Sequence, residues 1–188
     1  MSEAAFSSGQ HAASATNRET AAALDFDTLF RECAADVHSY AITLLGDRAG
    51  AEDVTALAFE RLYRTRSRLD HRRGTPRALL FAIARNAALD ELRRRLRRGH
   101  ALADEQARDE SALEAIEQVE RRATLSDALT QLSLREREIV LLKFHGQLSN
   151  SELAKALGVS ESNAGTRLHR ALTHLRERCL ALDQQEVA

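Results

Sequence analysis

The chain contains very little that interrupts a helix: one proline and eight glycines in 188 residues. Proline breaks helices and glycine weakens them, so their scarcity leaves room for long helical segments. Strand-like alternation of apolar and polar residues is absent, and the dominant residues, alanine, leucine, arginine and glutamate, are good helix formers. The sequence therefore predicts an all-α protein.

Composition excludes several classes of protein. No run approaches the roughly 18 consecutive apolar residues that span a bilayer, so we expect no membrane insertion. The first 24 residues lack the pattern of a secretory signal, and their Ala/Ser/Thr-rich composition predicts a disordered tail. Cys33 and Cys179 lie far apart, which favours a reducing cytoplasm over a disulfide framework. We find no metal-ligand spacing, phosphate-cradling loop or nucleophile–base pair, and so expect no metal, no cofactor and no enzymatic activity.

Charge is strongly segregated along the chain, although the formal net charge is only −1. Residues 61–100 hold 13 arginines against three acidic residues, whereas residues 1–60 and 101–138 are both acidic. Three acids are too few to pair 13 arginines through helical i,i+4 contacts. Such an excess is typical of a surface that binds nucleic acid, unless the acidic flanks fold over it.

The spacing of apolar residues and the helix-capping patterns divide the chain into two helical domains. The first three helices are expected to begin near Phe26, near Ala49 and at Arg77, the third ending near Arg98. Farther along, two Ser-x-x-Glu capping boxes open helices, and a glycine closes the short second one. The predicted order is a disordered tail (1–24), a helical domain (25–98), an acidic linker (99–122), a second helical domain (123–182) and a tail (183–188).

The end of the chain has the pattern of a helix-turn-helix. A short helix, a tight turn around Gly158 and a helix with polar residues at its start follow one another. In this motif the start of the second helix enters the major groove, where asparagine can read adenine and arginine can read guanine or hold phosphate. The exposed candidates are Glu161, Ser162, Asn163, Thr166, Arg167 and Arg170.

The stretch FAIARNAALDELRRRLRR (81–98) predicts a helix with two different faces. At 100° per residue, Leu89, Leu92 and Leu96 form an apolar stripe that we expect to pack. The adjacent arc presents arginines suited to phosphate and an asparagine suited to a base edge. Asp90, on this arc, either touches DNA or orients a neighbouring arginine. The arc consists of Asn86, Asp90, Arg93, Arg94 and Arg97.

Three stretches occur in this order: AEDVTALAFERLYR (51–64), LLFAIARNAALDELRRR (79–95) and LSNSELAKALGVSESNAGTRLHRAL (148–172). Together they resemble bacterial RNA polymerase sigma factors of the small, two-domain extracytoplasmic-function (ECF) group. The resemblance implies a cytoplasmic protein that binds the clamp and flap of core RNA polymerase. It would recognise the −35 element and melt the −10 element of promoter DNA, and an anti-sigma factor would restrain it.

The resemblance also assigns site residues to both domains. The polymerase-facing helix would include Glu52, Asp53, Phe59, Arg61 and Tyr63. The −10 element would meet Asn86, Asp90, Arg93, Arg94 and Arg97, with Arg72 and Arg73 in the preceding loop. The −35 element would be read by Ser162, Asn163, Thr166, Arg167 and Arg170.

The chain departs from the common family pattern at three places. Ala56-Leu57 stand where members often have Gln-Glu, Leu79 where tryptophan is common, and Gly165 where a basic residue is frequent. The alternative function is a helix-turn-helix transcriptional regulator that acts without joining polymerase. That alternative leaves residues 51–98 unexplained, and no sensor or receiver domain accompanies the motif.

Overall fold

The computed structural model describes residues 26–65, 74–99 and 116–186. Within these ranges the regular structure is all helical, which confirms the predicted class, and no helix there is both long and apolar enough to cross a bilayer. The expected tail 1–24, Arg72, Arg73 and most of the acidic linker lie outside the described ranges. The helices are α2 (Phe26–Leu45), α3 (Arg48–Thr65), α4 (Pro76–Arg97), α5 (Ile116–Thr130), α6 (Leu134–Phe144), α7 (Asn150–Leu157) and α8 (Glu161–Glu186).

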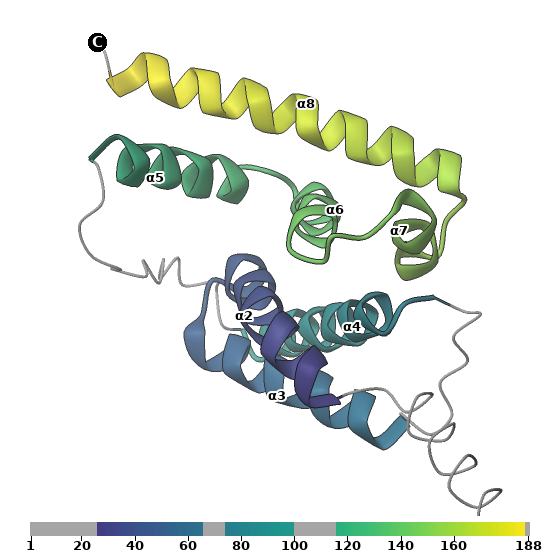
Figure 1. The fold of residues 1–188 in the computed structure, drawn as a ribbon. Coiled ribbons are helices and arrows are strands. Elements are labelled where there is room, and N and C mark those ends of the chain that lie inside the picture. The colour runs from purple at the N-terminus through teal and green to yellow at the C-terminus, as the bar shows by residue number, and fades with distance from the viewer. Residues whose placement is uncertain (1–25, 66–73, 100–115, 187–188) are drawn as a thin grey trace, which may run out of the picture.

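Helices α2, α3 and α4 pack together as the N-terminal domain (Figure 1). Local signals set its helix starts: the Thr75 hydroxyl accepts a hydrogen bond from the backbone N–H of Ala78 at the start of α4, and Pro76 occupies the first turn. The apolar faces meet in a core where Val37, Leu62 and Leu80 are fully buried, as are Tyr40 and Phe81, whose rings pack edge to face.

Helices α5 to α8 form the C-terminal domain, with α5 beside the long α8 (Figure 1). Both predicted capping boxes are present, at Ser133 and at Ser149, and Gly158 ends α7 in the left-handed conformation. Helix α5 begins at Ile116, within the stretch SALEAIEQVERR (111–122), where a helix leading from the linker into the second domain is expected. Helix α8 runs to Glu186, farther than the expected end of the domain at residue 182, because no proline or glycine follows Gly165.

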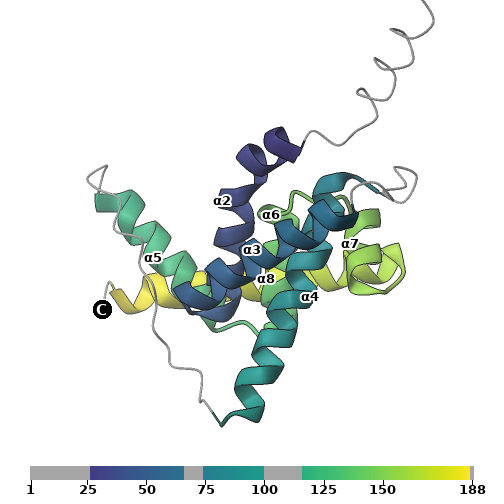
Figure 2. The same ribbon diagram turned by 90° about the horizontal axis from the view of Figure 1, so that it is seen from below.

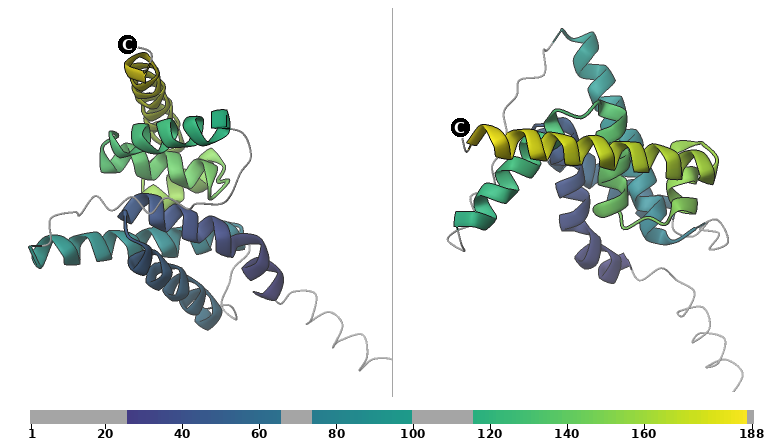
Figure 3. Two further views of the ribbon diagram at one scale, coloured as in Figure 1. Left: turned by 90° about the vertical axis from the view of Figure 1, so that its left-hand side faces the viewer. Right: turned by 90° about the horizontal axis from the view of Figure 1, so that it is seen from above.

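The two domains are not separate bodies. Helices α6 and α7 lie against α2 and α4 (Figures 1 and 3), and one hydrophobic core continues across the boundary. The side chains on its two sides include fully buried Val37 and Leu80 in one domain and Leu142 and Leu153 in the other. The sequence predicted two domains joined by a linker, and helical periodicity alone did not predict that they pack together.

Candidate nucleic-acid interface

The predicted arginine face is present on α4. Its C-terminal half projects beyond α2 and α3 (Figure 2), so that side chains there reach solvent on several sides. Four of the predicted residues form one stripe along the helix, because they stand at positions i, i+4, i+7 and i+11: Asn86, Asp90, Arg93 and Arg97. All five members of the face are exposed: Asn86, Asp90, Arg93, Arg94 and Arg97.

Ion pairs along α4 bear on the role of Asp90. Its Oδ1 lies 2.7 Å from Nη1 of Arg93, which supports the interpretation that Asp90 orients an arginine. Arg94 pairs in the same way with Glu91, at 2.8 Å. An exposed pair such as Asp90–Arg93 contributes roughly 0–1 kcal/mol, so phosphate can compete for the Arg93 guanidinium at little cost.

One residue near the end of α4 differs from the prediction. Leu96 was expected to pack, but its side chain is 70% exposed because the last turns of α4 extend past their neighbours.

Arg95 lies off the predicted face: Nη2 is 2.6 Å from Oδ2 of Asp47, and Nη1 donates to the carbonyl of Leu45 at 3.3 Å. A hydrogen bond from the Gly50 backbone N–H and the charge of Arg95 lower the pKa of Asp47. Arg95 therefore fixes α4 to the α2–α3 junction.

Several arginines of residues 61–100 have no acidic residue nearby in the sequence, and in the structure they pair with acidic residues from distant parts of the chain. Arg77 pairs with Asp36, 41 residues away, and Arg95 with Asp47, 48 residues away. Arg85 pairs with Glu138 of the C-terminal domain, at 2.6 Å. Part of the positive charge of residues 61–100 thus serves the fold, and the part on the outer face of α4 is left for a ligand.

The second predicted DNA-reading surface lies at the start of α8. The Ser160 hydroxyl accepts from the backbone N–H of Asn163 at 3.3 Å, as expected for the residue before the helix. One side of the helix is buried through Ala164, Leu168 and Ala171. The opposite side is exposed and carries the predicted set, Ser162, Asn163, Thr166, Arg167 and Arg170.

Gly165 stands within this reading helix. A Cβ at this position would meet no atom within 4 Å, so the protein itself does not require glycine there. Leu79, another departure from the family pattern, packs half-buried against the core.

The predicted polymerase-facing surface on α3 requires one correction. Glu52, Asp53 and Arg61 are exposed, and Tyr63 is half-exposed. Phe59 is only 4% exposed, because its ring packs against Phe26 and against Phe30 at centroid distances of 6.0 and 4.8 Å. Phe59 therefore belongs to the core and presents no surface to a partner.

These features define a class of protein: an all-helical DNA-binding protein with a helix-turn-helix domain and a second, arginine-faced domain. Residues 29–98 match the family model described as Sigma-70 region 2, and residues 122–175 match Sigma-70, region 4. The ECF RNA polymerase sigma factor SigL of Mycobacterium tuberculosis is 33% identical over 150 residues, which cover 79% of this chain and 85% of SigL. The RNA polymerase sigma-E factor of Streptomyces coelicolor is 32% identical over 142 residues, which cover 74% and 77%.

The chain therefore belongs to the ECF sigma factors of RNA polymerase, the proteins that direct promoter-specific initiation of transcription. The alternative of a regulator that never joins polymerase is not favoured, since the region 2 match covers the domain that such a regulator would lack.

Two solved structures share the fold. The sigma factor RpoE from Bartonella quintana, in complex with the anti-sigma factor NepR, has a TM-score of 0.65 at 20% identity over 82% of this chain and 96% of RpoE. CnrH, in complex with the cytosolic domain of CnrY, has a TM-score of 0.62 at 22% identity over 87% and 94%. At these identities the likeness concerns the two-domain helical architecture alone.

Proposed function

We propose that the two domains divide promoter recognition between them. Residues 25–98 bind core RNA polymerase and the −10 element, and residues 123–182 read the −35 element. The observation that supports this division is shared by α4 and the start of α8. Each helix buries one face in the protein and exposes a second face rich in groups that bind phosphates and base edges.

At the −10 element no covalent step is required, and the task is to hold DNA strands apart. Unstacking a base costs a few kcal/mol, which contacts with the separated strand must offset. Arg93, Arg94 and Arg97 supply phosphate contacts, and Asn86 supplies an amide for a base edge. Asp90 acts through Arg93, which it positions for the phosphate.

At the −35 element, recognition takes place in duplex DNA. Asn163 and Arg167, exposed one helical turn apart, are placed to read base edges in the major groove. Ser162, Thr166 and Arg170 border them and contact the backbone. The first two side chains therefore provide the sequence specificity, and the other three fix the position of the helix on the DNA.

The polymerase contact falls on the exposed face of α3. We assign it to Glu52, Asp53, Arg61 and Tyr63, while Phe59 supports this face from within the core. Glu52 is held by Arg48, 3.1 Å away. The clamp of polymerase is the expected partner of this domain, and the flap that of the C-terminal domain.

We further propose an anti-sigma factor as a partner, as RpoE has in its complex with NepR. We place the protein in the cytoplasm, since its substrate is chromosomal promoter DNA. It acts as a regulator of transcription with no catalytic activity of its own, because its work is binding and strand separation.

Two asparagine variants test the division of labour in the reconstituted holoenzyme. Asn86→Ala should slow melting of the −10 region by tenfold or more, measured with a fluorescent base analogue, and leave core binding and −35 duplex binding unchanged. Asn163→Ala is its matched counterpart. It should weaken −35 duplex binding by about 5- to 150-fold, the discrimination of about 1–3 kcal/mol that one good base contact provides. Equal loss of core binding in either variant would assign that asparagine a structural role instead.

A further inference from the structure

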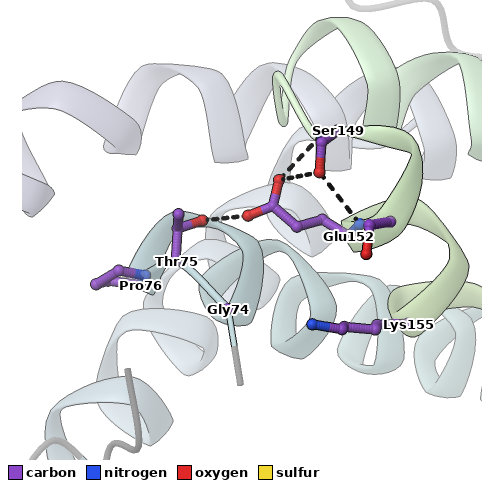
Figure 4. Close-up of a pocket in the computed structure, with 7 residues that line it drawn as sticks. Gly74, Thr75, Pro76, Ser149, Glu152 and Lys155 are labelled. Carbon is purple, nitrogen blue, oxygen red and sulfur yellow. Dashed lines mark hydrogen bonds between the residues drawn. The ribbon is translucent and has the colours of Figure 1, made fainter. Parts of the chain in front are cut away.

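The two ends of α4 are held in different ways. Before its first turn, the Thr75 hydroxyl donates to Oε1 of Glu152 at 2.6 Å (Figure 4), and the first half of the helix is buried in the core around Phe81. Leu92 is the last buried residue of α4, and among the described residues that follow it only Arg95 is not exposed. The phosphate-binding arginines of the −10 face all come after Leu92, so their position depends on what holds Arg95.

The guanidinium of Arg95 makes three contacts. Nη2 lies 2.6 Å from Oδ2 of Asp47, and Nη1 donates to the carbonyl of Leu45 at 3.3 Å. Nε donates to Oε1 of Glu91, one turn earlier on α4, at 3.1 Å. Leu45 ends α2, where a carbonyl has no partner within the helix and lies at the negative end of the helix dipole. The planar fork of arginine suits these partners, because its N–H groups point in fixed directions.

Gly50 makes room for this guanidinium. It is buried in the first turn of α3, where a Cβ would clash with Nη2 of Arg95 and would lie 2.7 Å from Oδ2 of Asp47. The backbone N–H of Gly50 donates to the same Oδ2 at 2.7 Å. Alanine favours a helix more than glycine does, so the helix itself gives no reason for a glycine here. The close approach of the guanidinium is that reason.

Glu91 extends these contacts to the −10 face. Its Oε1 accepts from Arg95, and its Oε2 lies 2.8 Å from Nη1 of Arg94. The Glu91 side chain is 19% exposed, whereas that of Arg94 is 50% exposed. Glu91 therefore connects a guanidinium assigned above to phosphate with one that is fixed to the α2–α3 junction.

The same contacts join α4 to the helix assigned above to polymerase. Asp47 caps the start of α3, since its carboxylate accepts from the N–H of Gly50 and its carbonyl accepts from the N–H of Ala51 at 3.0 Å. Glu52 and Asp53 follow directly and are exposed. Because Arg95 binds the capping carboxylate, it ties the arginine-bearing end of α4 to the start of α3.

We propose that Arg95, Asp47, Gly50 and Glu91, named here the Arg95 anchor, are positioning residues for melting of the −10 element. The proposal rests on the proposed function, which assigns α3 to polymerase and the outer face of α4 to the separated strand. Polymerase holds α3, the Arg95 anchor holds the end of α4 against α3, and the arginines of α4 hold the phosphates of the strand in place. Without the anchor these arginines keep their charge but lose their fixed position, so less of their binding offsets the unstacking of bases.

Gly50→Ala tests the Arg95 anchor, because it adds one methyl group and changes no charge. The clashing atoms are the ends of two flexible side chains, so they can move away while the backbone keeps its fold. The assay uses the reconstituted holoenzyme on a promoter mapped by transcription of genomic fragments. The variant should melt the −10 region about tenfold more slowly, as expected when a hydrogen bond to a charged group is no longer in place. Its affinities for core polymerase and for the −35 duplex should equal those of wild type.

The matched control is Ala49→Ser, which adds one atom on the exposed side of the same helical turn. It should melt the promoter at the wild-type rate. A folded Gly50→Ala variant that also melts the promoter at the wild-type rate refutes the Arg95 anchor. A loss of core binding equal to the loss of melting refutes it as well, because it would assign Gly50 to the polymerase contact.

Two further readouts separate a positioning role from a loss of structure. On a promoter whose −10 region is already open through mismatched base pairs, Gly50→Ala should initiate at the wild-type rate, because no unstacking is left to offset. Arg95→Gln should slow melting to a similar extent, and Gly50→Ala should add nothing to it, since both changes remove the same contact. A deficit that persists on the open promoter, or losses that add up in the double variant, would overturn the proposal.

If Gly50→Ala fails to fold by circular dichroism, Arg95→Lys takes its place with the same expected results, because lysine keeps the charge and loses the fork. The wild-type protein separates this proposal from the proposed function. A wild-type protein that initiates at promoters, together with variants that melt them equally fast, refutes the Arg95 anchor alone. A wild-type protein that gives no promoter-dependent transcript refutes the proposed function.

Discussion

We predict that removing the hydroxyl of Tyr40 stabilises the protein. Tyr40 is fully buried in the N-terminal domain, and its Oη has no hydrogen-bond partner. Burial, and next the charge of Glu138, raise the pKa of Tyr40 far above its usual value, so the hydroxyl is neutral and protonated throughout the physiological range. A buried polar group without a partner costs about 1–3 kcal/mol. Tyr40→Phe removes this group and keeps the ring that packs against Phe81.

The expected gain is about 1 kcal/mol in the free energy of unfolding, at the low end of that range because the small void left by the oxygen offsets part of it. For a chain of this size, 1 kcal/mol corresponds to a rise in Tm of roughly 2–4 °C. Urea unfolding followed by circular dichroism measures the change. Tyr63→Phe, at the half-exposed second tyrosine, is the control and should lie within about 0.5 kcal/mol of wild type. A loss of 1 kcal/mol or more in Tyr40→Phe would show that the hydroxyl has a partner and would refute the reasoning.

Three further predictions concern salt, pH and helix propensity. Arg97→Gln should reduce the slope of log affinity against log salt for promoter binding by about one, as expected for one lost phosphate contact; an unchanged slope would remove Arg97 from the interface. Burial lowers the pKa of His145 below its usual value of about 6.5, although the charge of Asp36 acts in the opposite direction. At pH values between the lowered pKa and about 6.5, the unfolded chain therefore binds more protons than the folded chain. Stability should therefore fall as pH drops through that window, and His145→Gln should flatten this part of a urea-melt series; an equal slope in the variant would contradict the assignment. Gly165→Ala should raise the unfolding free energy by about 1 kcal/mol, since the space for a methyl group is open, and a loss in urea melts would show that the position is constrained.

Local signals in the sequence predicted the helices well, because the forces that start and end a helix act within a few residues. The capping boxes at Ser133 and Ser149 and the left-handed Gly158 lie where the sequence placed them. The exposed faces of α4 and of the start of α8 follow from helical periodicity alone. Periodicity gives the face of a residue, but it does not give the length of the neighbouring helices, which is why Leu96 is exposed against expectation.

The packing of the two domains could not be predicted in the same way. The partners of Arg77 and Arg85 come from segments far away in the chain, so the acidic residues within residues 61–100 do not include them. One signal was present: Glu138 immediately precedes four apolar residues, Ile139, Val140, Leu141 and Leu142, all of which are buried with it. Burying a charged side chain is costly unless it is paired with an opposite charge, and the arginine-rich segment contains many such charges. Phe59 was misplaced because its role was carried over from the family pattern, whereas its aromatic neighbours place it in the core.

The central claim is that this protein gives RNA polymerase its promoter specificity. The direct measurement is transcription of a library of genomic fragments by core polymerase from the same organism, with and without the protein, followed by mapping of RNA 5′ ends. We predict discrete new 5′ ends that share two upstream sequence elements about 25 base pairs apart, as the names of the −10 and −35 elements imply, and a stable complex of the protein with core polymerase. Transcripts that do not depend on the protein, together with no core complex, would contradict the account.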